Sequence, residues 1–175
     1  MKEARAKFIC LVAALLFALC AHAAAAQTAT AKAEDKVLLS VGGEVPKPLG
    51  LTAGDLSKLP RRSIKAKDHD GKEYTFEGVE LVEVLRLAGV GFGEHLRGKA
   101  VANYLLVEAS DGYKAVFALP EVDPEYSERV VLLADKRDGA ALAPAEGPFR
   151  IIVEGEKRHA RWVRQVTKLT IRKSD

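Results

Sequence analysis

Both cysteines of this 175-residue chain, Cys10 and Cys20, lie inside one N-terminal apolar segment. Three basic residues precede an unbroken apolar run at positions 8–21, and the small residues of AHAAAAQ follow it. This order is typical of a secretory signal peptide. We expect residues 1–26 to be removed by cleavage after Ala26. The mature chain would then contain no cysteine, so its fold must depend on a hydrophobic core without disulfides or thiolate metal ligands.

The N-terminal segment leaves three weaker alternatives. Cleavage after Ala23 also fits the small-residue pattern, and a retained anchor is disfavoured because the apolar run is shorter than the roughly 20 residues that span a bilayer. A lipoprotein is disfavoured because Leu19 is too large for the position before a lipidated Cys20. The n-region MKEARAK has no Arg-Arg pair, which favours a Sec-type signal. We therefore expect a periplasmic or secreted protein with no transmembrane anchor after cleavage.

The charge of the chain is unevenly distributed. The whole chain has 27 basic and 24 acidic residues, whereas residues 147–175 contain eight basic and three acidic ones. A net charge this small argues against general nucleic-acid binding, because such proteins carry an extended basic surface. The local excess instead favours a C-terminal site. Removal of residues 1–26 leaves roughly 150 residues, enough for one domain with its own core.

The pattern after the signal peptide predicts a flexible leader at residues 27–36 and one domain at 37–173. VLLSVGG predicts a strand that ends in a glycine turn, and Thr52 with Asp55 predicts the cap of a short helix that Pro60 ends. Residues 63–67 and 73–76 predict a hairpin whose turn is DHDG, with His69 at its tip.

The remaining segments predict one amphipathic helix and further strands. Apolar residues recur at helical spacing over 79–88, and a glycine-rich loop follows. Residues 104–109 and 113–118 predict a second hairpin, and strands are expected at 130–134, 149–153 and 166–171, with a turn at 137–139. The fold class is α+β, with mostly antiparallel strands and short helices.

The stretch GPFRIIVEGEKRHARWVR, residues 147–164, gathers cations beside the only tryptophan, Trp162. Arginine offers a planar fork that matches phosphate or carboxylate, so this bend is a candidate anion site. The alternative is a solvated charged face, since surface charges contribute little. The basic residues are Arg150, Lys157, Arg158, Arg161 and Arg164, with His159 among them.

Other candidate chemistry is less specific. His69, His95 and His159 are far apart in the sequence, which leaves a three-histidine metal site open. Asp68 and Asp70 flank His69 and could orient it as a base, although aspartates in turns usually cap their own backbone. The glycines at 89, 91 and 93 follow a predicted helix instead of a strand, so they do not form a dinucleotide-binding loop.

The order of the segments resembles the sulfite-oxidase-type molybdopterin-binding oxidoreductase domain over residues 37–172. That resemblance implies an α+β fold whose loops converge on a pterin pyrophosphate and a molybdenum atom, in enzymes that move oxygen atoms to or from sulfur compounds. The motifs that carry it are Asp111-Gly112-Tyr113, Leu132-Leu133-Ala134 before Asp138-Gly139, and Gly147-Pro148-Phe149-Arg150 leading to Arg161-Trp162-Val163.

The resemblance also implies roles for single residues. His69 stands where the family has its molybdenum-ligating cysteine, and imidazole is a harder, neutral ligand than thiolate. With Asp111 and Tyr113 near the mouth of the site, His69 is a catalytic candidate. Trp162 is expected to form a wall of the cofactor site or simply to belong to the core. The residues expected to bind the anionic cofactor are Arg150, Lys157, Arg158 and Arg161.

Two functions follow from these observations. The first is an exported oxidoreductase of the molybdopterin-binding type with an altered metal site, which acts alone or with a redox or accessory partner. The alternative is a cofactor-free binding or accessory module that uses the basic pocket for a small anion or an acidic partner. The predicted Sec-type export favours the alternative, because a chain exported unfolded cannot carry a cofactor whose site forms only on folding.

Overall fold

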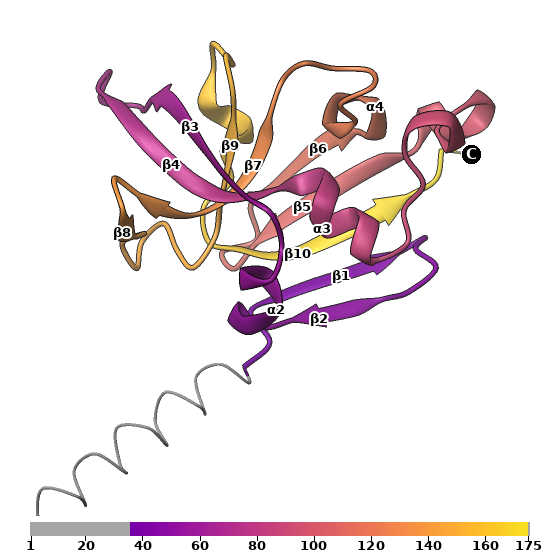
Figure 1. The fold of residues 1–175 in the computed structure, drawn as a ribbon, viewed down its shortest axis with the longest axis horizontal. Helices are drawn as coiled ribbons and strands as arrows, with labels where there is room; N and C mark the ends of the chain where they lie inside the picture. Colours follow the sequence, from indigo (N-terminus) through magenta and orange to yellow (C-terminus); the bar gives the residue numbers. More distant parts are fainter. Residues whose placement is uncertain (1–35, 175) are drawn as a thin grey trace, which may run out of the picture. The chain divides into compact units, whose positions relative to one another are not determined.

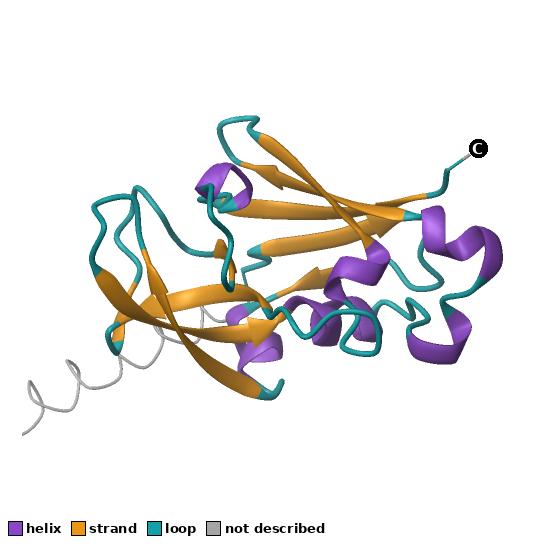
Figure 2. Ribbon diagram, turned by 90° about the horizontal axis from the view of Figure 1, so that it is seen from above, coloured by secondary structure: helices purple, strands orange, loops and turns teal. Residues whose placement is uncertain are grey.

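Two five-stranded sheets contain the strands of residues 36–174, which are the residues that the computed structural model describes (Figures 1 and 2). The expected signal peptide and the leader up to residue 35 lie outside the described residues. The first sheet has the order β2-β1-β10-β5-β6 and contains β1 (Leu39–Gly43), β2 (Leu49–Leu51), β5 (Tyr104–Ala109), β6 (Lys114–Ala118) and β10 (Val166–Arg172). The second contains β3 (Arg61–Lys67), β4 (Glu73–Glu80), β7 (Val131–Arg137), β8 (Ala140–Ala141) and β9 (Arg150–Val153), which pairs with β7.

The strand pairs are antiparallel except for β1 and β10, which run parallel. The indigo start and the yellow end of the domain therefore lie side by side in one sheet (Figure 1). The structure confirms the predicted α+β class with mostly antiparallel strands.

The helices are short. They are α2 (Ala53–Ser57), α3 (Leu81–Leu87) and α4 (Leu119–Val122), with 3-10 turns η1 (Gly93–His95), η2 (Gly98–Ala102) and η3 (His159–Arg161). The predicted capping of α2 is present, because the Thr52 hydroxyl accepts the Asp55 amide at 3.2 Å and the Asp55 carboxylate accepts the Thr52 amide at 3.1 Å. No helix of residues 36–174 is long and apolar enough to cross a membrane.

The β3–β4 hairpin forms as its turn sequence predicts. The Gly71 amide donates to the Asp68 carbonyl at 2.9 Å, and Gly71 has a φ of +77°, which glycine adopts without strain. The second strand is longer than predicted, since Val79 still pairs with Arg61 and with Leu133. The helix predicted to begin at 79 therefore begins at Leu81.

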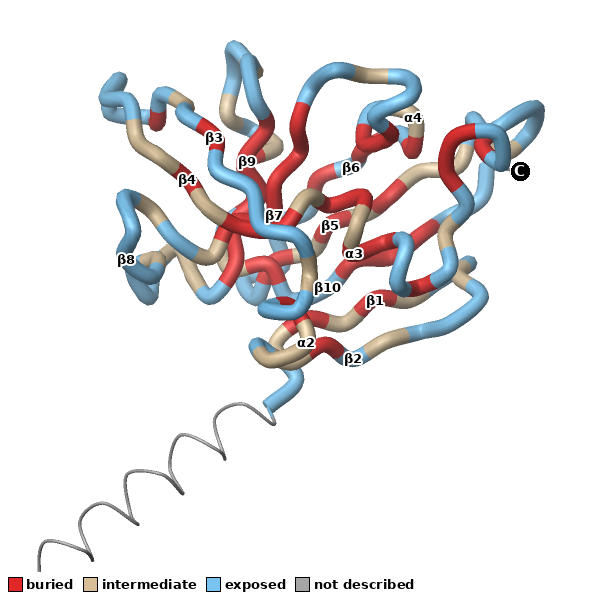
Figure 3. Tube along the Cα trace, viewed as in Figure 1, coloured by how far each residue is buried: buried red, intermediate tan, exposed pale blue. Residues whose placement is uncertain are grey.

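The core lies between the two sheets and α3. Figure 3 shows buried backbone along β1, β5, β7, β9 and α3, with exposed turns around it. All five apolar positions that the sequence places on the inner face of this helical segment are buried: Val79, Leu81, Val82, Leu85 and Ala88. The core thus supports the fold without any cysteine among residues 36–174.

Three short elements are absent from the sequence prediction, namely β2, β8 and α4. Each has two to four residues, too few to show periodicity. β2 forms because Leu51 pairs with Leu39, and β8 forms because Ala140 pairs with Arg137. The predicted strand at 130–134 also extends to Arg137, so the turn begins at Asp138.

Candidate functional site

One pocket of about 300 Å³ collects residues from three turns that are distant in the sequence. The β3–β4 turn supplies His69, the β5–β6 turn supplies Asp111 and Tyr113, and the segment from η3 to β10 supplies the rest. We call it the histidine pocket. Its lining is His69, Asp111, Tyr113, His159, Ala160, Trp162, Val163 and Arg164.

The two histidines of this pocket face each other. Their ring centroids are 4.8 Å apart with planes at 87°, and the His159 ring lies 4.1 Å from that of Trp162. In Figure 1 the β3–β4 turn and the gold loop after β9 rise on the same side of the domain. Burial, together with the nearby His69, lowers the pKa of His159 below its ordinary value, which favours its neutral form.

Beneath His69 lies a buried ion pair. Both nitrogens of the Arg150 fork donate to the Asp68 carboxylate, at 2.7 and 2.8 Å, and Asp68 also accepts the His69 amide at 2.8 Å. Arg150 is 0% exposed and Asp68 7%. A second carboxylate, Glu146, lies 3.3 Å from Arg150. The charge of Arg150 is therefore compensated inside the protein.

Arg150 also packs against two aromatic rings that are in contact with each other. Its guanidinium carbon lies 5.4 Å from the Trp162 ring centroid and 5.6 Å from that of Phe76. Trp162 is itself 4% exposed, so it belongs to the core and also forms a wall of the histidine pocket. Of the two roles that the sequence left open for Trp162, the structure shows the core position.

The other predicted cofactor-binding cations lie outside the pocket lining. Arg161 donates to Glu156 at 2.6 and 2.8 Å and to Glu121 at 2.7 Å, while Lys157 and Arg158 are exposed. The basic bend is thus divided between internal ion pairs and solvent, because Arg150 and Arg161 each bind one carboxylate from a distant segment and one from nearby in the sequence. The partners that sequence reasoning missed are Asp68, Glu121, Glu146 and Glu156. Of the basic residues in the bend, Arg164 and His159 line the pocket.

The candidates at the mouth have structural contacts of their own. The Tyr113 hydroxyl donates to the Ala160 carbonyl at 2.7 Å, which joins the β5–β6 turn to η3. Asp111 accepts the Tyr113 amide at 2.9 Å and so caps its turn. His95 lies in η1 and does not line the histidine pocket. The ligand atoms of Asp68, His69 and His159, by contrast, all lie within 4.8 Å of one another.

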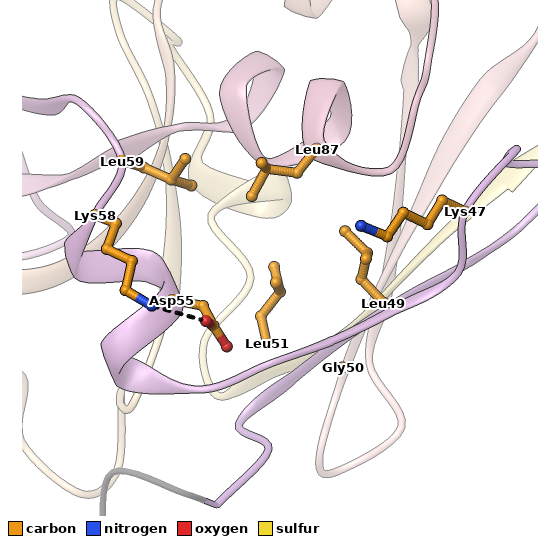
Figure 4. A pocket seen from close by; sticks show the side chains of 8 residues that line it. All are labelled: Lys47, Leu49, Gly50, Leu51, Asp55, Lys58, Leu59 and Leu87. Carbon is orange, nitrogen blue, oxygen red and sulfur yellow. Dashed lines mark hydrogen bonds and ion pairs between the residues drawn. The ribbon is translucent and has the colours of Figure 1, made fainter.

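Two other hollows contain none of the predicted site residues. One of about 320 Å³ lies between β2, α2 and α3, where Leu49, Leu51, Leu59 and Leu87 face a common space and Asp55 pairs with Lys58 at its edge (Figure 4). The other, of about 410 Å³, is lined mainly by apolar residues that include Leu38, Leu56 and Phe149. The aspartate in each lining is paired with a basic residue, Asp55 with Lys58 and Asp135 with Arg61.

The comparisons with known proteins assign the family. Residues 25–175 match the model of the oxidoreductase molybdopterin binding domain. The chain belongs to this family. This result confirms the resemblance seen in the sequence.

The family assignment agrees with a solved structure, the sulfane dehydrogenase SoxCD from Paracoccus pantotrophus. The match has a TM-score of 0.60 and 25% sequence identity, and it covers 76% of this chain. It covers 37% of the other chain, so the present family member spans little more than a third of that protein. No curated protein matches the chain.

The side chains of this family member do not fit a molybdenum cofactor in the way the resemblance implies. The resemblance places His69 at the position of the thiolate ligand, and residues 36–174 contain no cysteine. The arginine expected to meet the pyrophosphate, Arg150, is fully buried against Asp68. An anion with several charges needs cations that are not already neutralised. Of the residues that line the histidine pocket, Arg164 is the one with a permanent positive charge.

Proposed function

We propose that this protein is an exported binding or accessory module of the molybdopterin-binding family, with a degenerate metal site that works without the molybdenum cofactor. The observation that carries the proposal is the buried Arg150–Asp68 pair directly beneath His69. To bind a pyrophosphate, Arg150 would have to leave Asp68, and an uncompensated buried carboxylate is costly.

The loss of the thiolate supports the same proposal. Imidazole carries no negative charge, so it would give molybdenum a different charge balance from that of a thiolate. The remaining exposed cations, Lys157 and Arg158, lie on the loop before η3, and Arg164 lies at the pocket. These residues are where a small anion, or an acidic accessory or redox partner, would bind the module.

The test of cofactor content uses the chain expressed with its own signal in a host that makes active molybdoenzymes. Molybdenum is measured by mass spectrometry, and pterin is measured as the fluorescent product of oxidation. We expect both to be far below one equivalent per chain, with a host molybdoenzyme as positive control. One molybdenum and one pterin per chain would overturn the proposal in favour of an oxidoreductase with an altered ligand, the function that the family match alone favours.

The variant His69→Cys sharpens this test because it returns a thiolate to the ligand position. If only the ligand had been lost, this variant would load the cofactor. We expect it to remain without molybdenum, because Arg150 stays paired with Asp68. Stoichiometric loading of His69→Cys would show that the rest of the cofactor site is intact.

Export is tested separately by the intact mass of the protein recovered from the periplasm or the medium. We expect the mass of a chain whose first residue is Gln27, after removal of residues 1–26. A full-length protein that stays in the cytoplasm would contradict this part of the proposal.

A further inference from the structure

We propose that His69 and His159 bind a late first-row divalent transition ion, with Cu²⁺ bound most tightly. The proposal depends on the proposed function in one respect, namely that the molybdenum cofactor does not fill the histidine pocket. Two imidazoles from segments 90 positions apart lie with ring centroids 4.8 Å apart. With the Asp68 carboxylate, their ligand atoms form a group within 4.8 Å.

The distance between the ligand atoms of His69 and His159 can be compared with that in a metal site. Adjacent ligands at about 2.0–2.1 Å are roughly 2.9 Å apart around a tetragonal ion such as Cu²⁺ and roughly 3.4 Å apart around a tetrahedral one, so the two imidazoles must rotate toward each other to share an ion. His69 is exposed at a hairpin turn, which gives its ring room to move. His159 is held by its stacking on Trp162 at 4.1 Å. One ligand is thus held in place and the other can adjust to the ion.

Both imidazoles are available for coordination. The hydrogen bond from His69 to Asp68 uses the backbone amide and not the ring, and the His159 ring contacts the ring of Trp162. The Asp68 carboxylate lies within 4.8 Å of the two imidazoles, but both its oxygens accept the Arg150 fork, so the two histidines are the proposed ligands. Water or a small anion would complete the coordination.

The local charge permits a divalent cation. Near His69, Arg137 and Arg150 are matched by the carboxylates of Asp68 and Glu146. In the lining of the pocket, Arg164 is accompanied by the carboxylate of Asp111. An ion at the histidines therefore meets a nearly neutral surrounding. Nitrogen ligands select late transition ions, since Ca²⁺ and Mg²⁺ prefer six or more oxygens, and Cu²⁺ stands highest in the series of affinities.

The experiment is a titration of the mature, tag-free protein with Cu²⁺, read by tryptophan fluorescence. Trp162 is the only tryptophan and is in contact with His159, so bound Cu²⁺ should quench its emission. We expect saturable binding of one Cu²⁺, nitrogen hyperfine coupling in the electron paramagnetic resonance spectrum, weaker binding of Zn²⁺ and no response to Ca²⁺.

Three variants locate the ion. His159→Phe keeps a ring against Trp162, and His69→Asn keeps a turn-forming residue at the hairpin tip; each should weaken Cu²⁺ binding by at least about tenfold. His95→Asn is the matched control, since His95 lies outside the pocket, and it should bind as the wild type does. Wild-type affinity in both pocket variants, or the absence of nitrogen coupling, would overturn the proposal.

A second measurement needs no variant and so does not depend on their folding. Diethyl pyrocarbonate labels accessible imidazoles, and Cu²⁺ should protect His69 and His159 but leave His95 reactive. Equal labelling with and without the ion would count against the site. The molybdenum and pterin assays are made on the same preparation and keep the two proposals distinguishable. A protein that contains no molybdenum or pterin but fails to bind Cu²⁺ would contradict only the copper site.

Discussion

At the scale of single residues, Arg150 holds the position of His69. Its guanidinium binds both oxygens of Asp68, and Asp68 in turn accepts the backbone amide of His69. The pair is almost fully buried, so neither charge can be solvated by water if the other is removed. Arg150 is therefore a positioning residue for the hairpin turn, and the ion pair fixes the turn against the core at Trp162 and Phe76.

The change Arg150→Met tests this role. It preserves much of the side-chain volume but removes the buried cation of Asp68 and Glu146 and leaves them the more exposed Arg137, and we expect the free energy of unfolding to fall by about 3–5 kcal/mol. Arg62→Met is the matched control, because Arg62 pairs with Glu80 at the surface and its side chain is 50% exposed. That change should cost less than about 1 kcal/mol in urea unfolding. Equal losses in the two variants would show that the buried pair has no special role.

At the scale of elements, the contact of β4 with β7 depends on one glycine. The register between the two strands shifts between Glu77 and Gly78, and the backbone of β7 approaches Gly78 closely. A Cβ at this position would lie 2.1 Å from the carbonyl oxygen of Leu133. The pairing of β4 with both β3 and β7, which sets the direction of the hairpin that carries His69, therefore requires a residue without a side chain.

Gly78→Ala should separate β4 from β7 locally and lower the free energy of unfolding by about 1–3 kcal/mol or more. Gly54→Ala in α2 is the comparison, since its Cβ would meet only the Thr52 hydroxyl at an ordinary 3.6 Å. We expect Gly54→Ala to leave stability unchanged or to raise it by less than about 1 kcal/mol. Thermal and urea unfolding of both variants measure the difference, and a neutral Gly78→Ala would contradict the close approach.

At the scale of the whole molecule, local patterns predict the elements and fail to predict the charge pairs. The two hairpins and the cap of α2 follow from turn residues and alternation that lie within a few positions. For the basic bend, the sequence left an anion site and a solvated face open and did not show that Arg150 and Arg161 are paired internally, because one partner of each is remote in the sequence. Asp68 is 82 positions from Arg150, and Glu121 is 40 positions from Arg161. Only the sheet topology brings them together.

The buried Arg150–Asp68 pair should make the free energy of unfolding of the whole domain depend on pH in acid. Burial by itself would raise the pKa of Asp68, but the hydrogen bonds from Arg150 and from the His69 amide, with the charge of Arg150, hold this pKa well below its usual range. In the unfolded chain an aspartate titrates near about 3.9. The folded state therefore gains stability above that pH, and the gain is lost as the pH falls from about 4 toward the lower folded pKa.

The difference between wild type and Asp68→Asn isolates this contribution. Half-buried Glu108, whose pKa is lowered mainly by Lys114, lies outside the pair and affects both proteins alike. Burial lowers the pKa of His159 and the Asp68 charge partly opposes that shift, so the comparison is read below the range in which His159 titrates. We expect the wild type to be more stable at about pH 5, and the free energies of unfolding of the two proteins, measured in urea, to converge below about pH 4. Curves that stay parallel into acid would mean that Asp68 titrates alike in the folded and unfolded states. The bidentate pair beneath His69 would then not be the structure present in solution.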